Sequence, residues 1–237
     1  MRRYADLHLC PPLDDDANAR SMADVLSQLG TPVVGLVVPP DRLSPTPAAM
    51  GSFRAAGLDV AKRLNLTPRS REELLGGLRR FRARYEIVAV DCVTQSVSRV
   101  AVRDRRVDLV HFSGQGLGRS FRRNLAGMCR AALEFNMSEL TQGARYDAGL
   151  GRQRQQLEIA AEASIPVVGS TMASNPFELR APRDVAAVLH MLGLPPQAAL
   201  ASVSEIPLTI VRQNRLKAEH SDLEQGVRIV KRSAHDE

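Results

Sequence analysis

The sequence predicts a single α/β domain built as a TIM-like (β/α) barrel. Apolar runs of strand length alternate with segments whose apolar residues recur at spacings of three and four. This alternation is typical of a parallel sheet covered by helices. Seven or eight such units over about 200 residues favour a closed barrel. An open doubly wound sheet is the structural alternative, but no Gly-x-Gly-x-x-Gly follows the first apolar run.

The expected strands and helices follow one another regularly. The strands are the apolar runs at residues 4–10, 32–38, 63–66, 87–93, 107–112, 131–135 and 165–169. The helices between them are expected at 17–29, 53–62, 71–84, 96–103, 120–129 and 153–163. Beyond residue 169 the pattern changes to helices at 182–192 and 196–203 and a final segment at 206–211.

Two stretches lack this periodicity. Residues 39–51 contain four prolines and are expected to form an ordered loop after the second strand. Residues 218–237 are expected to be a partly disordered C-terminal tail. The barrel domain is therefore expected to span residues 1–217.

The charge balance points towards a polyanionic partner. Lys and Arg number 32 against 26 Asp and Glu, which gives a net charge of +6 and a pI of about 9.8. Of the basic residues, 29 are Arg, and guanidinium groups suit RNA because they bind phosphates as a fork and stack on bases. A GC-rich genome explains the same excess equally well.

The chain has the features of a cytoplasmic protein with no membrane partner. Cys10, Cys92 and Cys129 are widely separated in apolar contexts, as expected for buried thiols in a reducing compartment. No apolar run reaches the roughly 18 residues needed to span a bilayer. Asp6 and His8 stand where a signal peptide would need an apolar core.

Polar residues at the expected strand ends are candidates for a metal site. Asp6 and His8 begin an Asp-x-His-x-His pattern and are expected side by side on one strand face, but Cys10 replaces the second histidine. His111 and Glu134 fall at later strand ends, and active sites of such barrels lie at the carboxyl ends of the strands. These four side chains could ligate a divalent metal. Alternatively, each is a hydrogen-bonded loop anchor.

Other catalytic patterns are weaker. No Gly-x-Ser-x-Gly motif of a serine hydrolase is present. Cys10 and His8 could form a nucleophile–base pair, but a thiol packed in the core is the favoured interpretation of Cys10. The segment 114–118 (GQGLG) resembles a phosphate-binding loop, although a flexible turn explains it as well. Residues 169–171 (GST) could bind a phosphate near a helix N-terminus in a small-molecule enzyme.

Two arginine clusters are candidates for binding RNA. Arg99, Arg103, Arg105 and Arg106 lie along one expected helix and the turn behind it, with only Asp104 among them. The second cluster consists of Arg119, Arg122, Arg123 and Arg130. Such clusters can hold phosphates and release counterions, whereas the alternative is a solvated helical face. With 4% aromatic residues and no Trp, recognition of folded RNA through its backbone and shape is favoured.

Several segments together resemble a known family. They are 4–8 (YADLH), 87–90 (IVAV), 98–110 (SRVAVRDRRVDLV), 132–136 (ALEFN), 166–173 (PVVGSTMA), 179–184 (LRAPRD) and 203–207 (VSEIP), with Asn214. Over residues 4–217 the sequence resembles archaeal ribonuclease P protein component 3, a member of the polymerase and histidinol phosphatase (PHP) barrel group.

The resemblance implies a PHP-type barrel that is a protein subunit of ribonuclease P. In such a particle the RNA subunit removes the 5′ leader of precursor tRNA with Mg²⁺, so the protein has no catalytic residue and binds no cofactor of its own. Its implied partners are the ribonuclease P RNA, precursor tRNA, protein component 2 and the other protein subunits. Asp6, His8, His111 and Glu134 would be remnants of a lost metal site.

The residues expected to bind RNA include one more arginine. They are Arg99, Arg103, Arg105, Arg106, Arg119, Arg122, Arg123 and Arg180. Arg180 could instead pair with Asp184, and Arg105 with Asp104 or Asp108. A metal-dependent phosphoesterase of the PHP group is the functional alternative.

Overall fold

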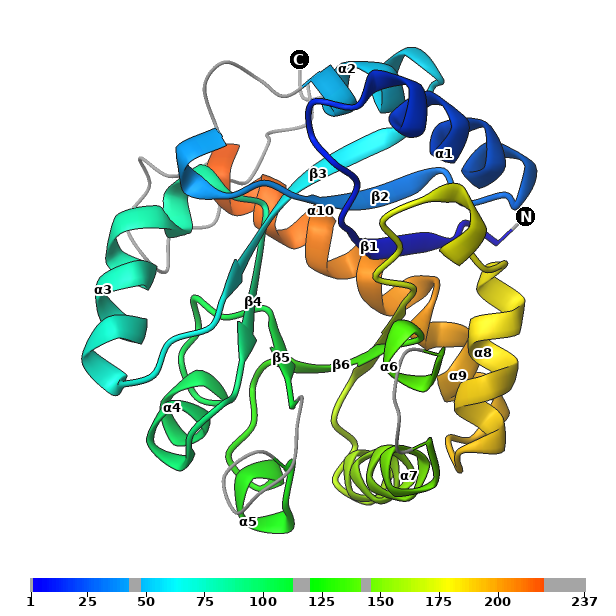
Figure 1. The fold of residues 1–237 in the computed structure, drawn as a ribbon. Coiled ribbons are helices and arrows are strands. Elements are labelled where there is room, and N and C mark those ends of the chain that lie inside the picture. Colours follow the sequence, from blue (N-terminus) through cyan, green and yellow to red (C-terminus); the bar gives the residue numbers. More distant parts are fainter. Residues whose placement is uncertain (1, 43–47, 113–119, 142–145, 220–237) are drawn as a thin grey trace, which may run out of the picture.

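The computed structural model describes residues 2–42, 48–112, 120–141 and 146–219, which form seven parallel strands inside a ring of helices (Figure 1). The strands are β1 (Ala5–Leu9), β2 (Val33–Val37), β3 (Asp59–Leu66), β4 (Ile87–Asp91), β5 (Leu109–His111), β6 (Ala132–Asn136) and β7 (Val167–Ser170). Each strand pairs with the next along the chain.

The sheet curves round until its first and last strands approach each other. Leu9 forms a parallel bridge with Ala173, just beyond β7, and the Cys10 N–H donates to the Ala173 carbonyl at 2.8 Å. This contact makes a nearly closed barrel. The predicted TIM-like fold is therefore confirmed, and the open doubly wound alternative is excluded.

The helices and short 3₁₀ turns follow the strands as expected. They are α1 (Asp16–Gln28), η1 (Pro40–Arg42), α2 (Ala48–Ala55), α3 (Arg71–Phe81), η2 (Arg82–Arg84), α4 (Gln95–Ala101), α5 (Arg123–Ala126), α6 (Ser138–Thr141), α7 (Tyr146–Glu162), η3 (Pro176–Glu178), α8 (Pro182–Met191), α9 (Pro196–Ser202) and α10 (Glu205–Glu219). Asp15, Ser70 and Thr94 begin α1, α3 and α4 as N-caps, each accepting a backbone N–H with its side chain.

The strands separate two layers of apolar packing. Outward side chains such as Val34, Leu64 and Val90 pack against the helices. Inward residues include Ala61, Ala89 and other small or branched residues that fill the lower barrel. This alternation follows from the two-residue period of a strand.

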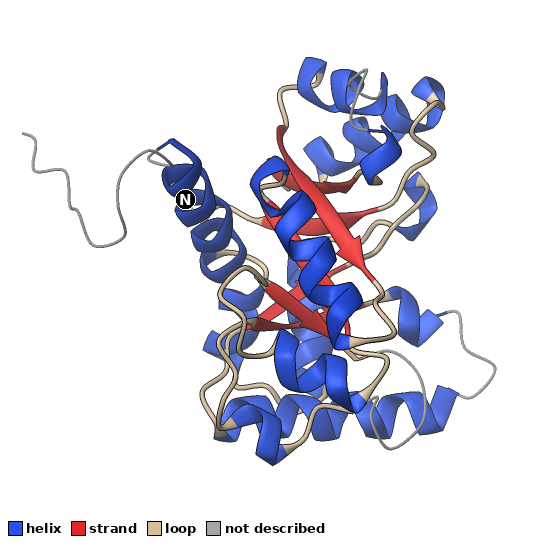
Figure 2. Ribbon diagram, turned by 90° about the vertical axis from the view of Figure 1, so that its left-hand side faces the viewer, coloured by secondary structure: helices blue, strands red, loops and turns tan. Residues whose placement is uncertain are grey.

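Helix α10 covers the amino ends of the strands, on the far side of the barrel in Figure 1 and at one end in Figure 2. Val211 joins the inner apolar layer, with Ile206 and Ile210 beside it. The Arg215 guanidinium pairs with Asp59 at 2.7 Å and with Glu86 at 2.5 Å, at the starts of β3 and β4. The opposite, carboxyl end of the barrel is its mouth.

The largest error of the sequence prediction is the helix at 53–62. The structure has α2 at Ala48–Ala55, and Gly57, at φ +80°, turns the chain into the eight-residue strand β3. Asp59 and Lys62 obscured the first half of this strand, because charged residues are uncommon in the strands of a buried parallel sheet. The loop expected at 39–51 is wrong in part, because it contains η1 and the start of α2.

Other boundaries differ less. The helix expected at 120–129 is only the four residues of α5, and the final segment 206–211 extends into the 15-residue helix α10. Because α10 reaches Glu219, the expected domain end at 217 falls inside a helix. Residues 220–237 and 114–118 lie outside the described part of the chain. Within that part, no helix is both long and apolar enough to cross a membrane.

Candidate functional site

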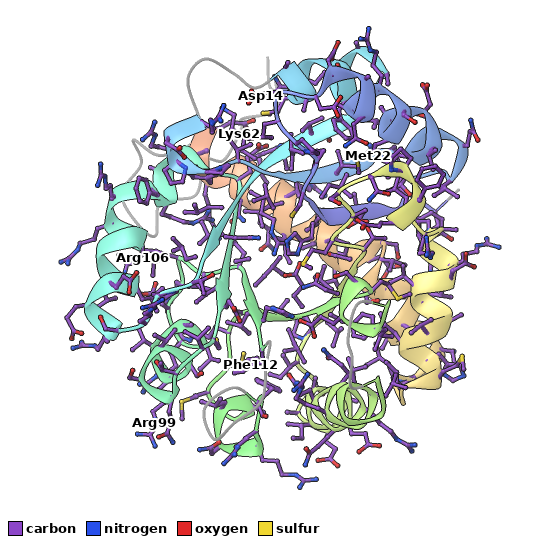
Figure 3. The ribbon with its side chains drawn as sticks, in the orientation of Figure 1. Asp14, Met22, Lys62, Arg99, Arg106 and Phe112 are labelled. Atoms are coloured by element: carbon purple, nitrogen blue, oxygen red, sulfur yellow. The ribbon has the colours of Figure 1, made fainter. Side chains whose placement is uncertain are left out.

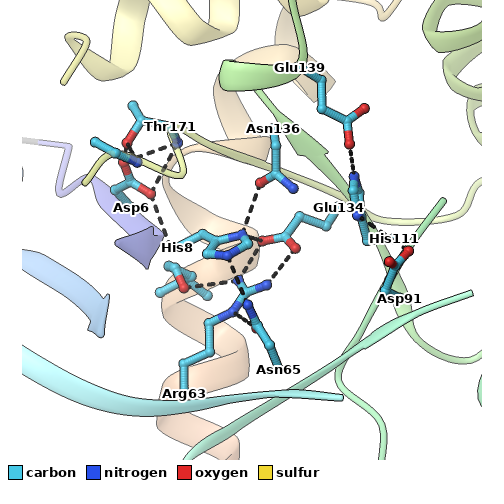
Figure 4. A network of polar contacts seen from close by, with 12 residues as sticks. Asp6, His8, Arg63, Asn65, Asp91, His111, Glu134, Asn136, Glu139 and Thr171 are labelled. Carbon is cyan, nitrogen blue, oxygen red and sulfur yellow. Dashed lines mark hydrogen bonds and ion pairs between the residues drawn. The ribbon is translucent and has the colours of Figure 1, made fainter. Parts of the chain in front are cut away.

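A buried ion pair occupies the barrel interior below the mouth (Figure 4). Arg63 extends inward from β3, and its side chain is 1% exposed. It forms a bidentate pair with Glu134 on β6, with Nη1–Oε1 and Nη2–Oε2 distances of 2.5 and 2.6 Å. Its Nε donates to Asn65 Oδ1, and its Nη1 donates to the Leu7 carbonyl. The guanidinium is therefore held on three sides by fixed acceptors.

The Leu7 carbonyl reaches the guanidinium because β1 leaves its regular register. The pairing of β1 with β2 shifts between Asp6 and Leu9. A side chain at Gly35 on β2 would collide with the Leu7 backbone, so only glycine permits this approach. Asp6 stabilises the irregular turn by accepting the backbone N–H of His8 at 3.1 Å.

His8 lies in the same network as Arg63 and has a defined tautomer. Its Nδ1 is 3.1 Å from Asn136 Oδ1 and 3.3 Å from Glu134 Oε1, while Asn65 Nδ2 donates to its Nε2 at 3.0 Å. Two acceptors at Nδ1 and one donor at Nε2 require the neutral ring protonated on Nδ1. Burial and the charge of Arg63 lower the pKa of His8, which keeps the ring neutral.

Asp6 faces Thr171 rather than the His8 ring. Its carboxylate accepts the Thr171 hydroxyl at 2.5 Å and the Thr171 N–H at 3.2 Å, across the seam between β1 and β7. Burial raises the pKa of Asp6 to about 6 despite these hydrogen bonds. The expectation that Asp6 and His8 lie side by side on one strand face is therefore wrong, because the irregularity in β1 directs the two side chains to different partners. The possible phosphate site at 169–171 is also not open, since Asp6 already takes the Thr171 donors.

His111, at the end of β5, makes a separate polar contact. Its Nε2 is 2.5 Å from Glu139 on α6, and its Nδ1 is 3.8 Å from Asp91 on β4. Burial disfavours the imidazolium, but the Glu139 carboxylate outweighs that effect and raises the pKa of His111. His111 and His8 therefore have pKa values displaced in opposite directions.

The four candidate ligands do not fit a metal ion. Among the described residues, no three His, Cys, Asp or Glu side chains are grouped so as to hold one. Glu134 has both oxygens committed to Arg63, and a cation would be repelled by that guanidinium. Asp6 and His111 use other partners. Sequence reasoning missed Arg63; its only signal was the two-residue spacing from Asn65 in the expected strand.

The cysteines are free thiols in poor positions for nucleophilic catalysis. Cys92 is buried, and Cys10 and Cys129 are partly buried. Burial raises the pKa of both Cys10 and Cys129 to about 11, so the reactive thiolate is disfavoured. The His8 ring, with both nitrogens occupied, is not available to Cys10 as a base.

Several of the predicted RNA-binding arginines are held by contacts within the protein. Arg106 pairs with Asp104 at 2.7 Å and Arg123 with Glu162 at 2.9 Å. Arg103 donates to the Arg99 carbonyl, and Arg180 donates to the carbonyls of Phe177 and Leu179 rather than pairing with Asp184. Arg119 lies outside the described residues.

The guanidinium groups of Arg99, Arg105 and Arg122 form no ion pair or hydrogen bond with the described part of the chain, and all three residues are exposed. Arg99 lies at the periphery of the barrel on α4 (Figure 3). Both aspartates expected as alternative partners of Arg105 have other contacts, because Asp104 binds Arg106 and Asp108 contacts Arg82 and Asn214. These three arginines are therefore available to an external anion.

Comparison with known proteins assigns the chain to a family. A family model described as RNase P subunit p30 matches residues 3–219. The chain belongs to the RNase P subunit p30 family. Among curated members, ribonuclease P protein component 3 of Methanococcoides burtonii is 26% identical over 220 residues, which cover 90% of this chain and 89% of the relative. The corresponding protein of Methanosarcina mazei is 25% identical over 207 residues, covering 85% and 86%.

Solved structures agree on the fold of this RNase P subunit. A chain of an archaeal ribonuclease P, determined by cryo-electron microscopy with mature tRNA, matches with a TM-score of 0.76 at 22% identity, covering 94% of this chain and 97% of that one. An amidohydrolase matches with a TM-score of 0.57 at 14% identity, covering 90% and 74%. The p30 barrel thus shares its architecture with an amidohydrolase. In this chain, however, the Arg63 guanidinium binds Glu134, one of the four candidate metal ligands.

Proposed function

We propose that this ribonuclease P subunit supports RNA-catalysed, Mg²⁺-dependent removal of the 5′ leader from precursor tRNA and has no nuclease activity alone. The observation that carries the proposal is the Arg63–Glu134 pair. A metal-dependent phosphoesterase needs carboxylate and imidazole ligands with free lone pairs. Here a guanidinium takes both oxygens of the central carboxylate.

The Mg²⁺ of the reaction is assigned to the RNA subunit. No protein cofactor is proposed, because the candidate metal ligands at the barrel mouth are already held by other protein side chains. His8 contacts Asn65 and Asn136, and Asp6 contacts Thr171. Their role is structural: they fill the interior of the barrel with hydrogen bonds that fix the strand ends.

The proposed partners are the ribonuclease P RNA, precursor tRNA, protein component 2 and the other protein subunits, in the cytoplasm. The net charge of +6 supports contact with RNA phosphates, as do the guanidinium groups of Arg99, Arg105 and Arg122, which have no partner among the described residues.

Reconstitution tests the proposal. Precursor tRNA is incubated with the RNA subunit and the other protein subunits at limiting Mg²⁺, with and without this chain. The expected result is faster leader removal when the chain is present, and no cleavage by the chain alone with Mg²⁺ or Mn²⁺. Cleavage by the isolated chain that His8→Gln abolishes would support the phosphoesterase instead. His8→Gln should leave the reconstituted activity within a few-fold of wild type.

A further inference from the structure

A hollow lies at the amino end of the barrel, opposite the mouth. It has a volume of about 520 Å³ and opens between α10 and the starts of β5 and β6. Its lining includes Val107, Arg105, Arg130, Ile206, Ile210 and Lys217. A volume of this size is within the range of small-molecule sites in proteins.

The floor of the hollow is apolar. Val107, Ala132 and Pro166 line it from the barrel side, and Ile206 and Ile210 line it from α10. Val107 and Ala132 are nearly fully buried, whereas the two isoleucines are only half-buried. Apolar side chains of α10 thus remain open to a ligand that has a flat, apolar face.

The rim of the hollow is basic. Arg105, Arg130 and Lys217 come from three separate parts of the chain. The guanidinium groups of Arg105 and Arg130 form no ion pair or hydrogen bond within the described ranges, and Lys217 contacts only the Asn214 amide oxygen, at 3.4 Å. Three cations therefore surround an apolar floor.

Two acids also line the hollow, and they offset the charge of this rim only in part, since Lys217 is the one rim cation that interacts with Asp108. Asp108 accepts the Val88 N–H and the Asn214 amide, both at 2.8 Å, and lies 3.3 Å from Arg82. Glu205 is exposed and lies 3.3 Å from Arg2. The potential at the opening is consequently positive, which favours an anionic ligand.

We propose that this hollow binds one unpaired nucleotide of an RNA partner. The base would lie against Ile206 and Ile210, and its phosphate would contact Arg105 and Arg130. Thr209 and Gln213, exposed on α10 at the same opening, supply polar groups for the edge of a base. The apolar floor offers van der Waals contact to the flat face of a base, in place of aromatic stacking, and the basic rim suits the anionic phosphate. The inference rests on the proposed function as an RNA-binding subunit.

Methyl NMR tests the binding of a nucleotide directly. The isoleucine methyl groups of the full chain are labelled and titrated with each ribonucleoside 5′-monophosphate, and separately with inorganic phosphate. The expected result is a saturable shift of the Ile206 and Ile210 signals with at least one nucleotide, while Ile159 on α7 stays unchanged. Arg130→Ala should weaken this binding by about tenfold, whereas Arg99→Ala, which removes another exposed guanidinium, should not.

Two outcomes of the titration would overturn the proposal. Equal shifts with inorganic phosphate and with nucleotides would mean that the rim binds phosphate and the floor takes no base. No shift at Ile206 or Ile210 with any nucleotide at millimolar concentration would remove the site altogether.

Cross-linking in the assembled particle distinguishes RNA from protein as the occupant. The photoreactive residue p-benzoylphenylalanine replaces Glu205, which is exposed at the same opening and has no assigned contact with the nucleotide. The wild-type particle is first checked for precursor-tRNA cleavage, which tests the proposed function by itself. In an active particle, a cross-link to one RNA position that Arg105→Ala diminishes is the expected result. A cross-link to another protein subunit, or none, would refute the nucleotide site while leaving the proposed function intact.

Discussion

Arg63 and Glu134 reach towards each other across the barrel interior from β3 and β6 and form a bidentate ion pair at 2.5 and 2.6 Å. Neither side chain is more than 1% exposed. Removing two charges from water is costly, so such a pair persists only when further hydrogen bonds satisfy both groups. Asn65, Leu7 and His8 supply them. The pair therefore depends on the whole network, and its single substitutions have predictable effects.

Loss of one partner should destabilise the barrel strongly. Glu134→Gln leaves a buried guanidinium without its counter-charge and should lower the free energy of unfolding by roughly 3–5 kcal/mol. Chemical denaturation measures this change. The control is Arg123→Ala, which breaks the exposed pair with Glu162 and should cost about 0–1 kcal/mol.

The double variant Arg63→Met/Glu134→Leu should be less destabilised than Glu134→Gln, because it removes both charges together. The single variants Arg63→Met and Glu134→Leu complete the comparison. If the double variant lost as much free energy of unfolding as the two single variants together, the two residues would act independently, contrary to the structure.

The pH dependence of stability should include a contribution from Asp6. Burial raises the pKa of this carboxyl from 3.8 to about 6, so the folded state favours the protonated form. The resulting stabilisation is fully present below about pH 4 and is lost as the pH rises through 6. The free energy of unfolding of wild type relative to Asp6→Asn should fall by roughly 3 kcal/mol between pH 4 and 7. An unchanged difference across this range would contradict the assignment.

The two barrel histidines should have pKa values on opposite sides of the ordinary imidazole value. The pKa of His8 is lowered by burial and by Arg63, and the pKa of His111 is raised by Glu139. Long-range ¹⁵N NMR should show His8 neutral and protonated at Nδ1 throughout the stable pH range. His111 should lose its proton above the ordinary imidazole pKa. Glu139→Gln should lower the pKa of His111, because it removes the neighbouring negative charge. A His8 ring that becomes charged near pH 6.5 would rule out the hydrogen-bond network described for His8.

Exposed and paired arginines should differ in how they affect RNA binding. Arg99→Ala and Arg122→Ala remove guanidinium groups that have no partner in the part of the chain that the structure describes. Each should weaken binding to the ribonuclease P RNA and reduce the slope of log K against log salt by about 0.7–0.9 per lost phosphate contact, with no change in melting temperature. Arg106→Ala breaks the pair with Asp104 and serves as the matched control, because its main effect should be on stability. Equal salt slopes for all three variants would refute these contacts.

The sequence carried most of the fold because the barrel depends on local periodicity. Alternating apolar runs located the seven strands, and caps such as Ser70 agree with the expected helix starts. The first half of β3 was missed because Asp59 and Lys62 are charged and only partly buried. Arg63, at the start of the expected strand, is buried through a partner on a distant strand. Arg63 meets Glu134 across 71 residues. No local pattern contains that information.

The sequence predicted which residues belong to the candidate site, but not which residues they contact. His111 does end β5, whereas Asp6, His8 and Glu134 lie inside β1 and β6 (Figure 4). Their partners, however, are Thr171, Asn136, Glu139 and Arg63. A shift in the β1 register and the absence of a side chain at Gly35 decide this arrangement. Both depend on how neighbouring strands pack, so the strand period alone could not foresee them.

Precursor-tRNA cleavage, measured under single-turnover conditions, tests the central claim most directly. Three samples are compared at limiting Mg²⁺: the RNA subunit with all protein subunits, the same particle lacking this chain, and the chain alone. A support role predicts a faster rate in the complete particle than in the particle lacking the chain, and no cleavage by the chain alone. Equal rates with and without the chain, or metal-dependent cleavage by the chain alone, would contradict the claim.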